Sequence, residues 1–191
     1  MSIVLVGSTS GSITLQEPAV AGTTVLDLPA VSGTILTTAS SGQSIPKAAL
    51  PTGSVLQVVN ATYSTQSSMS SSTYADSGLT VSITPTSSSS KILVAAHLTG
   101  IYVNDSANYL RAKVLRNSTD ITNDFSNVAG GYNASNGNIG AGTVSISYLD
   151  SPATTSTTTY KVQVSSATNS QTVYWSNGGS YSSITVMEIA A

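Results

Sequence analysis

Only one residue of the chain has the side chain that most often serves acid–base and metal chemistry. His97 is the single histidine, and it lies in the apolar run 93–98. A zinc site or a catalytic triad needs further partners, and the sequence has no cysteine and no second histidine. We therefore expect His97 in the core or at an interface. In a trimer it could instead meet its two copies at the three-fold axis, and this alternative stays open.

Two aspartates could act as a pair of carboxylates. Asp120 and Asp124 have the residue type that glycoside hydrolysis requires, but both lie in a polar, turn-rich stretch where Asp commonly caps the backbone. Segment 104–108 offers oxygen ligands without the Gly-to-Glu spacing of a calcium loop. We expect turns at both places, so the sequence favours a non-enzymatic protein without cofactor or metal. A depolymerising enzyme is the least favoured alternative.

Four aromatic residues near Gly-, Asn- and Ser-rich segments could stack on sugars. They are Tyr132, Tyr174, Trp175 and Tyr181. Packing in a strand core or at a trimer interface is the favoured interpretation, and contact with a glycan is the alternative.

The composition limits the partners that the chain can bind. Charged residues make up 7% of the 191 residues, and the net charge is -2. Ser and Thr supply about a third of the chain and take the surface role that charge usually has. Six Lys and Arg in total form no basic stripe for nucleic acid, and no apolar stretch approaches the length of a membrane span. The first residues do not have the pattern of a cleaved signal peptide, so we expect no nucleic-acid or membrane partner.

Residues 54–191 show the pattern of an antiparallel β-sandwich. Apolar and polar residues alternate clearly at 79–83 and 160–164. Segment 91–103 is longer than a usual strand, so we expect it to bend near Gly100 or to split. Turn-forming residues separate eight β-rich segments, which are 55–63, 79–84, 91–103, 109–116, 143–149, 160–165, 171–175 and 183–189.

An internal repeat with a period of eleven residues precedes this domain. Segment 18–22 (PAVAG) recurs as segment 29–33 (PAVSG), and each unit contains a short β-rich run, a proline corner and a glycine. A single stack of such β-rich repeat units has too small an apolar face to be stable alone, so it should pack on copies of itself or on a host surface. We expect residues 1–40 to anchor the chain, residues 41–53 to be a linker, and residues 54–191 to form the main domain. The anchoring residues would be Pro18, Val20, Gly22, Leu26, Leu28, Pro29, Val31 and Gly33.

The repeat resembles the opening of many bacteriophage virion proteins, on the pattern GSITL, PAVAGT and LPAVSGTIL across residues 11–36. The remainder is similar to a second pattern that recurs in phage proteins. Its segments are 53–59, 81–85, 90–94, 149–154 and 183–189.

The resemblance implies a C-terminal jelly-roll knob that is loosely similar to the trimeric C1q and tumour-necrosis-factor heads. It implies an all-β homotrimer, with a short N-terminal β-repeat arm followed by a jelly-roll sandwich. Modules of this kind occur on head fibres, tail fibres and capsid decoration proteins.

We therefore expect a structural protein on the outer surface of a phage virion. The favoured role is a capsid decoration or cement protein, or a head fibre, bound to the major capsid protein or another virion protein through the N-terminal segment. The alternative is a short tail fibre or receptor-binding knob that contacts host surface glycans through loops such as 127–142.

Overall fold

The computed structural model describes residues 3–6, 12–15, 50–104, 108–122, 125–131 and 139–191. The chain divides into two compact units, Met1–Ser44 and Ile45–Ala191, and the boundary falls within the predicted linker 41–53. In the first unit β1 (Ile3–Val6) pairs antiparallel with β2 (Ser12–Leu15). The predicted anchoring residues between Pro18 and Gly33 lie outside the described residues.

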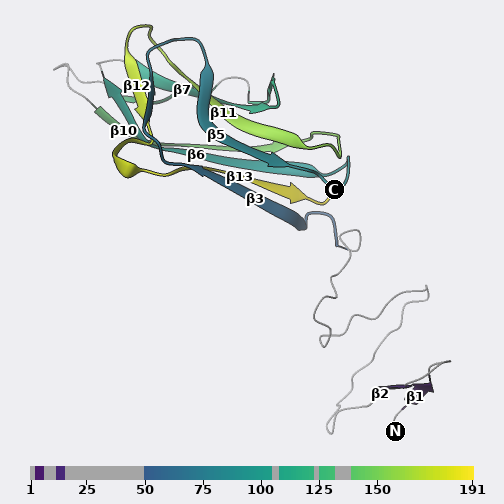
Figure 1. The fold of residues 1–191 in the computed structure, drawn as a ribbon. Coiled ribbons are helices and arrows are strands. Elements are labelled where there is room, and N and C mark those ends of the chain that lie inside the picture. Colours follow the sequence, from purple (N-terminus) through teal and green to yellow (C-terminus); the bar gives the residue numbers. More distant parts are fainter. Residues whose placement is uncertain (1–2, 7–11, 16–49, 105–107, 123–124, 132–138) are drawn as a thin grey trace. The chain divides into compact units, whose positions relative to one another are not determined.

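The second unit is a sandwich of two antiparallel sheets (Figure 1). The first sheet has the order β3, β13, β6, β10, and at the far end of β6 the strands β12 and β4 replace β13 and β3. Its strands are β3 (Val55–Tyr63), β4 (Ser67–Met69), β6 (Lys91–Asn104), β10 (Ile139–Asp150), β12 (Thr172–Trp175) and β13 (Ser182–Ile189).

The second sheet has the order β5, β11, β7, and β7 then pairs with both β8 and β9. Its strands are β5 (Ala75–Ile83), β7 (Asn108–Arg116), β8 (Thr119–Asp120), β9 (Phe125–Gly131) and β11 (Thr158–Ser166). A 3-10 turn, η2 (Asn177–Gly179), connects β12 to β13. The described residues contain no α-helix, so the all-β prediction is confirmed.

Successive strands cross repeatedly between the two sheets, which gives the sandwich a jelly-roll-like topology. The period-two pattern explains why these segments pair, because every second side chain can be buried between the sheets. In β13, Ser182, Ile184, Val186 and Glu188 are buried while the intervening residues are not. Fully buried side chains from both sheets, including Val94, Val162 and Ile184, share one core.

Strand β6 is one continuous strand of 14 residues that changes partner along its length. Its first half pairs with β13 up to His97, and its last residues pair with β12 from Tyr102. Gly100 lies between these halves with a φ of 58°, and the opposite strand β10 shifts register at the same level. The glycine at which a bend was predicted is therefore the site of a local irregularity in the pairing.

The structure differs from the sequence prediction in two respects. Segment 127–142 was expected to be a loop, but β9 occupies Phe125–Gly131 and β10 begins at Ile139. The Gly- and Asn-rich composition argues against a strand locally, and pairing with β7 overrides it. The short strands β4 and β8 were also not predicted, because runs of three and two residues carry no period.

Candidate functional site

His97 lies on the exposed outer face of the first sheet rather than in the core. Its Nδ1 atom lies 2.9 Å from the hydroxyl oxygen of Ser145 on the neighbouring strand β10. Odd-numbered residues of this part of β6 point away from the core, because Val94, Ala96 and Leu98 point into it. Of the two predicted environments, the core is therefore wrong, and an interface is still a prediction.

Asp120 forms the local contacts that its position in a turn predicts. Its Oδ1 atom accepts a hydrogen bond of 3.0 Å from the backbone N–H of Thr122, and Lys113 lies 3.6 Å from Oδ2. Asp124, the other half of the candidate pair, lies outside the described residues. Within the described part of the chain, no group of three or more His, Cys, Asp or Glu is placed to hold a metal ion.

The four candidate aromatics lie in different environments. Trp175 is only 4% exposed, and its indole N–H donates to the carbonyl oxygen of Ser77, so it belongs to the core and cannot stack on a sugar. Tyr181, directly before β13, is 71% exposed. Tyr174 is half-buried and forms an edge-to-face pair with Tyr102, with ring centroids 5.5 Å apart. Tyr132 lies outside the described residues.

A row of four apolar side chains crosses the outer face of the first sheet. Met187 of β13 is in register with Val58 of β3 on one side and with Leu93 of β6 on the other. Leu93 is in turn in register with Leu149 of β10. The two ends of the row are the most open, since Val58 is 56% and Leu149 is 55% exposed. We call this row the apolar row.

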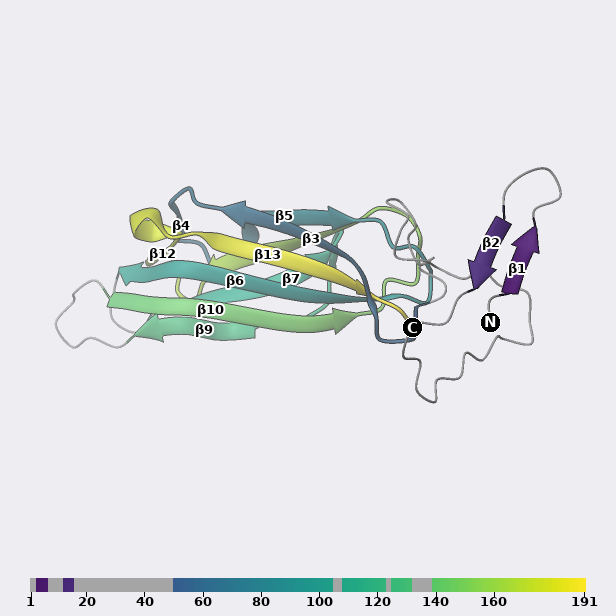
Figure 2. The same ribbon diagram turned by 90° about the horizontal axis from the view of Figure 1, so that it is seen from below.

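Two rows of small or uncharged side chains lie on one side of the apolar row. The row next to the apolar row, two residues away along each strand, holds Asn60, Thr185, Ala95 and Ser147. The row after it holds Thr62, Ser183, His97 and Ser145. The strands that carry these rows lie side by side in Figure 2. We call the three rows together the β3–β10 face. His97 is the only ionisable side chain in these three rows.

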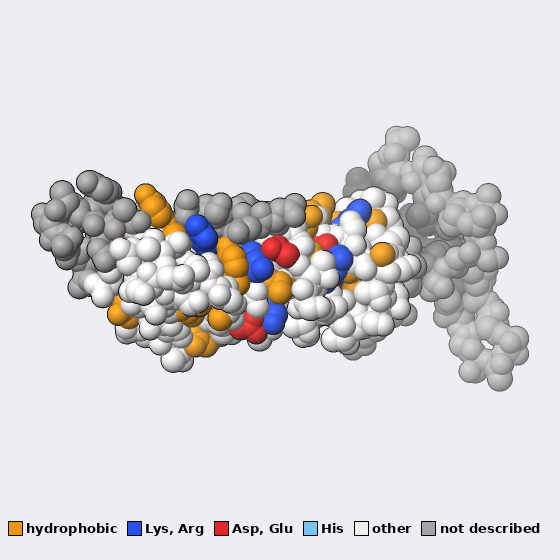
Figure 3. Space-filling model, turned by 90° about the horizontal axis from the view of Figure 1, so that it is seen from above, with side chains coloured by type: hydrophobic (Ala, Val, Ile, Leu, Met, Phe, Trp, Pro, Cys, Tyr) orange, Lys and Arg blue, Asp and Glu red, His pale blue; other side chains and the backbone are white. Residues whose placement is uncertain are grey.

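The outer face of the second sheet is charged instead. Arg111 and Lys113 of β7 and Lys161 of β11 lie on it together with Asp76 of β5, and these charges gather over the same strands in Figure 3. The Nζ atom of Lys161 lies 2.9 Å from Asp76, and that of Lys113 lies 4.4 Å above the ring of Tyr74. This face is therefore charged, whereas the three rows of the β3–β10 face contain no carboxylate and no ammonium group.

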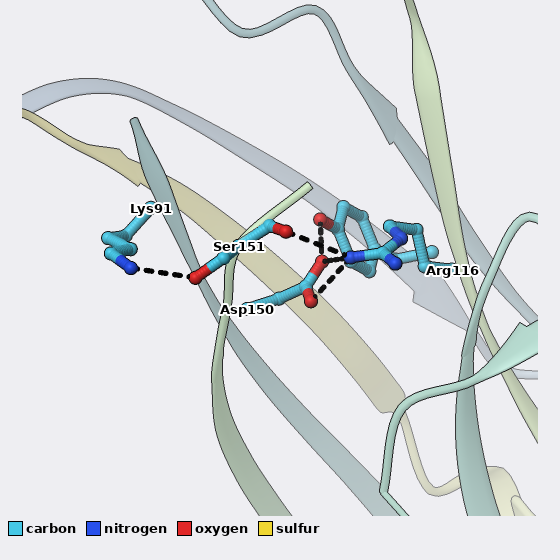
Figure 4. A network of polar contacts seen from close by, with 5 residues as sticks. Lys91, Arg116, Asp150 and Ser151 are labelled. Carbon is cyan, nitrogen blue, oxygen red and sulfur yellow. Dashed lines mark hydrogen bonds and ion pairs between the residues drawn. The ribbon is translucent and has the colours of Figure 1, made fainter. Parts of the chain in front are cut away.

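A buried carboxylate connects the two sheets at one end of the sandwich (Figure 4). Asp150 ends β10 and is 4% exposed. Both of its oxygens accept hydrogen bonds from Nη1 of Arg116, at 2.7 and 3.0 Å, and Oδ2 also accepts one of 2.7 Å from the hydroxyl of Tyr160. Burial, aided by this carboxylate, raises the pKa of Tyr160 above its ordinary range. The cluster therefore connects the end of β10 to β7 and β11.

A second buried carboxylate, Glu188 of β13, is fully enclosed. It accepts hydrogen bonds from Nε2 of Gln57 at 2.6 Å and from the backbone N–H and the hydroxyl of Thr86, both at 2.7 Å. Burial alone would raise the pKa of Glu188, but the hydrogen bonds outweigh it and lower the pKa. With its oxygens engaged in this way, Glu188 is an anchor for the segment that follows β5.

An open hollow of about 410 Å³ lies next to this segment. Its walls contain no amine, imidazole or carboxylate side chain, so they offer no acid–base group. The lining residues are Leu50, Thr52, Leu56, Thr86, Ser87, Ser89, Ser90, Ala190 and Ala191.

The sequence prediction did not identify the apolar row. The signal was present at Leu93 and Met187, because both follow directly after a core residue and so place apolar side chains on both faces of their strands. What the sequence does not show is the register that aligns these residues with Val58 and Leu149 on neighbouring strands.

Comparison with known proteins found no protein-family model that matches the chain and no curated protein that is similar to it. In the described part of the chain, no helix has the length and apolar character needed to cross a bilayer.

Proposed function

We propose that this chain is a non-enzymatic structural protein of the outer surface of a bacteriophage particle, where it assembles as a homotrimer. In this role the sandwich of residues 54–191 is the exposed knob, and residues 1–40 attach it to the major capsid protein or another virion protein. The proposal of a phage virion rests on the resemblance of residues 11–36 and of the later segments to phage proteins. The observation that supports assembly is the β3–β10 face.

The β3–β10 face has the chemistry of a surface that can be desolvated at low cost. The apolar row spans four adjacent strands. On association, the exposed parts of Val58 and Leu149 would be removed from contact with water. The remaining rows carry hydroxyl, amide and methyl groups, which cost far less to bury than charged groups do. Within this face the amide of Asn60 already donates to the hydroxyl of Thr185 at 2.8 Å.

The absence of carboxylates and ammonium groups from these three rows favours a second copy as the partner. A partner with a charged surface would be bound by opposite charges on this face. The three rows carry no charge while the imidazole is neutral. Around the three-fold axis of a trimer, the copies bring identical groups together, and a neutral face creates no like-charge repulsion there. The charged outer face of the second sheet, with Lys161 and Asp76, is suited to solvent instead.

A capsid decoration protein or head fibre is the favoured position on the particle. The low charge of the chain is suited to cementing, since weakly charged faces are desolvated cheaply. Immunogold electron microscopy of intact virions, with antibodies against residues 54–191, tests this position. Label spread over the head supports it, and label confined to the tail excludes it. The absence of label from particles would refute the virion role itself.

A receptor-binding knob is the second candidate, and the exposed aromatic residues favour it. Tyr181 is 71% exposed. The edge-to-face pair of Tyr102 and Tyr174 lies on the outer side of the first sheet. Binding of the full chain to host cells or their polysaccharide would support this function if the Tyr181→Ser variant bound at least tenfold more weakly. A variant on the opposite sheet, Thr80→Ser, should bind as the parent chain does.

A further inference from the structure

His97 occupies the part of the β3–β10 face that lies two rows from the apolar row. It is exposed on β6, with Ser183 of β13 in register on one side and Ser145 of β10 on the other. Because Nδ1 is held 2.9 Å from the Ser145 hydroxyl, the imidazole ring has one nitrogen engaged within the chain. The other nitrogen has no hydrogen-bond partner among the described residues.

The neighbours of His97 include no group that would stabilise a positive charge. On β13 and β3 the facing side chains are Ser183, Thr185 and Thr62, and on β10 they are Ser145 and Ser147. Along β6 itself the outward neighbours are Ala95 and Thr99, and the nearest charged side chain on this side of the strand is the cationic Lys91, six residues away. No carboxylate of the described chain faces the imidazole. The acidic groups of the second unit, such as Asp76, Asp150 and Glu188, are paired elsewhere.

We propose that His97 makes self-association through the β3–β10 face dependent on pH, with the copies associated when the imidazole is neutral and separated when it is protonated. This inference rests on the self-association in the proposed function. In the proposed trimer the β3–β10 face surrounds the three-fold axis, so the partner copies bring further His97 side chains and no carboxylate of this face. A protonated imidazole would have to leave water without an opposite charge, and that transfer is strongly unfavourable.

The direction of the effect follows from proton linkage. Protons bind more readily to the separated chains, where the imidazole is solvated, than to the associated ones. Acidification therefore drives dissociation, and the effect lies in the range from about pH 8 to pH 5 in which histidine side chains titrate. At pH values below the range in which the separated chains take up the proton, the association constant should fall by roughly tenfold per pH unit. This factor applies to each His97 that the interface buries.

Sedimentation velocity of the full chain at pH 7.5 and pH 5.0 tests the proposal, with His97→Gln as the comparison. Glutamine retains a polar side chain that can bond to Ser145 but takes up no proton in this range. We expect the parent chain to be associated at pH 7.5 and to dissociate at pH 5.0. The His97→Gln variant should stay associated at both values. Circular dichroism at pH 5.0 should show the same β-sheet content for both proteins, because the pKa values of Asp76 and Glu188 are lowered and these groups remain ionised.

Each other outcome refutes a specific part of the argument. If the parent chain and His97→Gln both stay associated at pH 5.0, the inference is wrong and the proposed assembly stands. If both dissociate at pH 5.0, another group controls the acid response and the inference is again wrong. If the parent chain is monomeric even at pH 7.5, the proposed self-association fails, and the inference fails with it.

Discussion

The guanidinium of Arg116 at the end of β7 donates two hydrogen bonds from Nη1 to the carboxylate of Asp150 at the end of β10, so this pair joins the two sheets of the sandwich. Asp150 is 4% exposed, and the hydroxyl of Tyr160 on β11 occupies part of its remaining hydrogen-bonding capacity. A carboxylate held in this way is stable only while its partners stay in place, because a buried charge without a partner is costly.

Replacement of Asp150 by Asn should therefore destabilise the sandwich. The change leaves the Arg116 guanidinium, which is 27% exposed, without its counter-charge, and we expect the free energy of unfolding to fall by about 2–4 kcal/mol. Urea denaturation at pH 7 measures this difference. The matched control is Asp76→Asn, which removes a pair with Lys161 in which the aspartate is 56% exposed, and it should cost less than about 1 kcal/mol. Equal losses in the two variants would contradict the structural role of Asp150.

Gly100 should not tolerate a side chain. A Cβ at this position would lie 2.7 Å from the carbonyl oxygen and 2.8 Å from the nitrogen of Asn177, which are backbone atoms of η2, and the φ of 58° disfavours other residues. We expect Gly100→Ala to lower the free energy of unfolding by roughly 2–4 kcal/mol. Gly140→Ala in β10 is the control, since a Cβ there meets nothing within 4 Å. The argument from close approach is wrong if both variants unfold at the same urea concentration.

Much of this fold follows from period-two patterning, and the parts that do not follow have identifiable reasons. Strand β3 begins and ends at the predicted residues Val55 and Tyr63, and Gly100, where the length of β6 predicted an interruption, has a positive φ. Strand β9 was not predicted, because its stability comes from pairing with β7 and not from its own residue types. Register is likewise a property of pairs of strands, so the apolar row could not be read from single segments.

The stability of the sandwich should decline in acid partly through Glu188. Its pKa is lowered in the folded chain, so the ionised carboxylate stabilises the fold above the ordinary glutamate pKa of about 4.3, and this contribution is lost as the pH falls through the lowered value. Urea denaturation of the parent chain and of Glu188→Gln between pH 7 and pH 2.5 measures it.

At pH 7 we expect Glu188→Gln to be less stable than the parent chain by about 1–3 kcal/mol. Glutamine has a single accepting oxygen, so its N–H₂ group would face the donors of either Gln57 or Thr86. Below about pH 4.3 the difference should shrink, since the glutamate of the unfolded chain becomes protonated there, and it should be lost once the pH passes through the lowered pKa of the folded chain. Asp76→Asn is the control, because it removes the other carboxylate whose pKa is lowered. A difference between Glu188→Gln and the parent that is constant over the whole pH range would show that Glu188 is not the titrating group.

Deletion of residues 1–40 should separate assembly from attachment. The compact unit Ile45–Ala191 contains the whole sandwich, so the truncated chain should fold and keep the oligomeric state of the full chain. It should no longer attach to the particle, because the proposed anchor has been removed. Sedimentation velocity and co-pelleting with virions measure the two properties. A monomeric or aggregated truncation would place the repeat within the assembly itself.

A charge in the apolar row should prevent self-association. Val58 is 56% exposed at the β3 end of the row, where its neighbour in register is Met187, so Val58→Asp should not disturb the core. In an assembly through this face the new carboxylate would be desolvated without an opposite charge, and we expect the association constant to fall by about a hundredfold or more. Thr80→Asp, on the exposed face of β5 and in register with Lys161, is the matched control and should associate as the parent chain does. Sedimentation equilibrium of the three proteins at pH 7.5 distinguishes the two faces. Weaker association of Thr80→Asp alone would move the interface to the charged sheet, and unchanged association of Val58→Asp would exclude the apolar row from it.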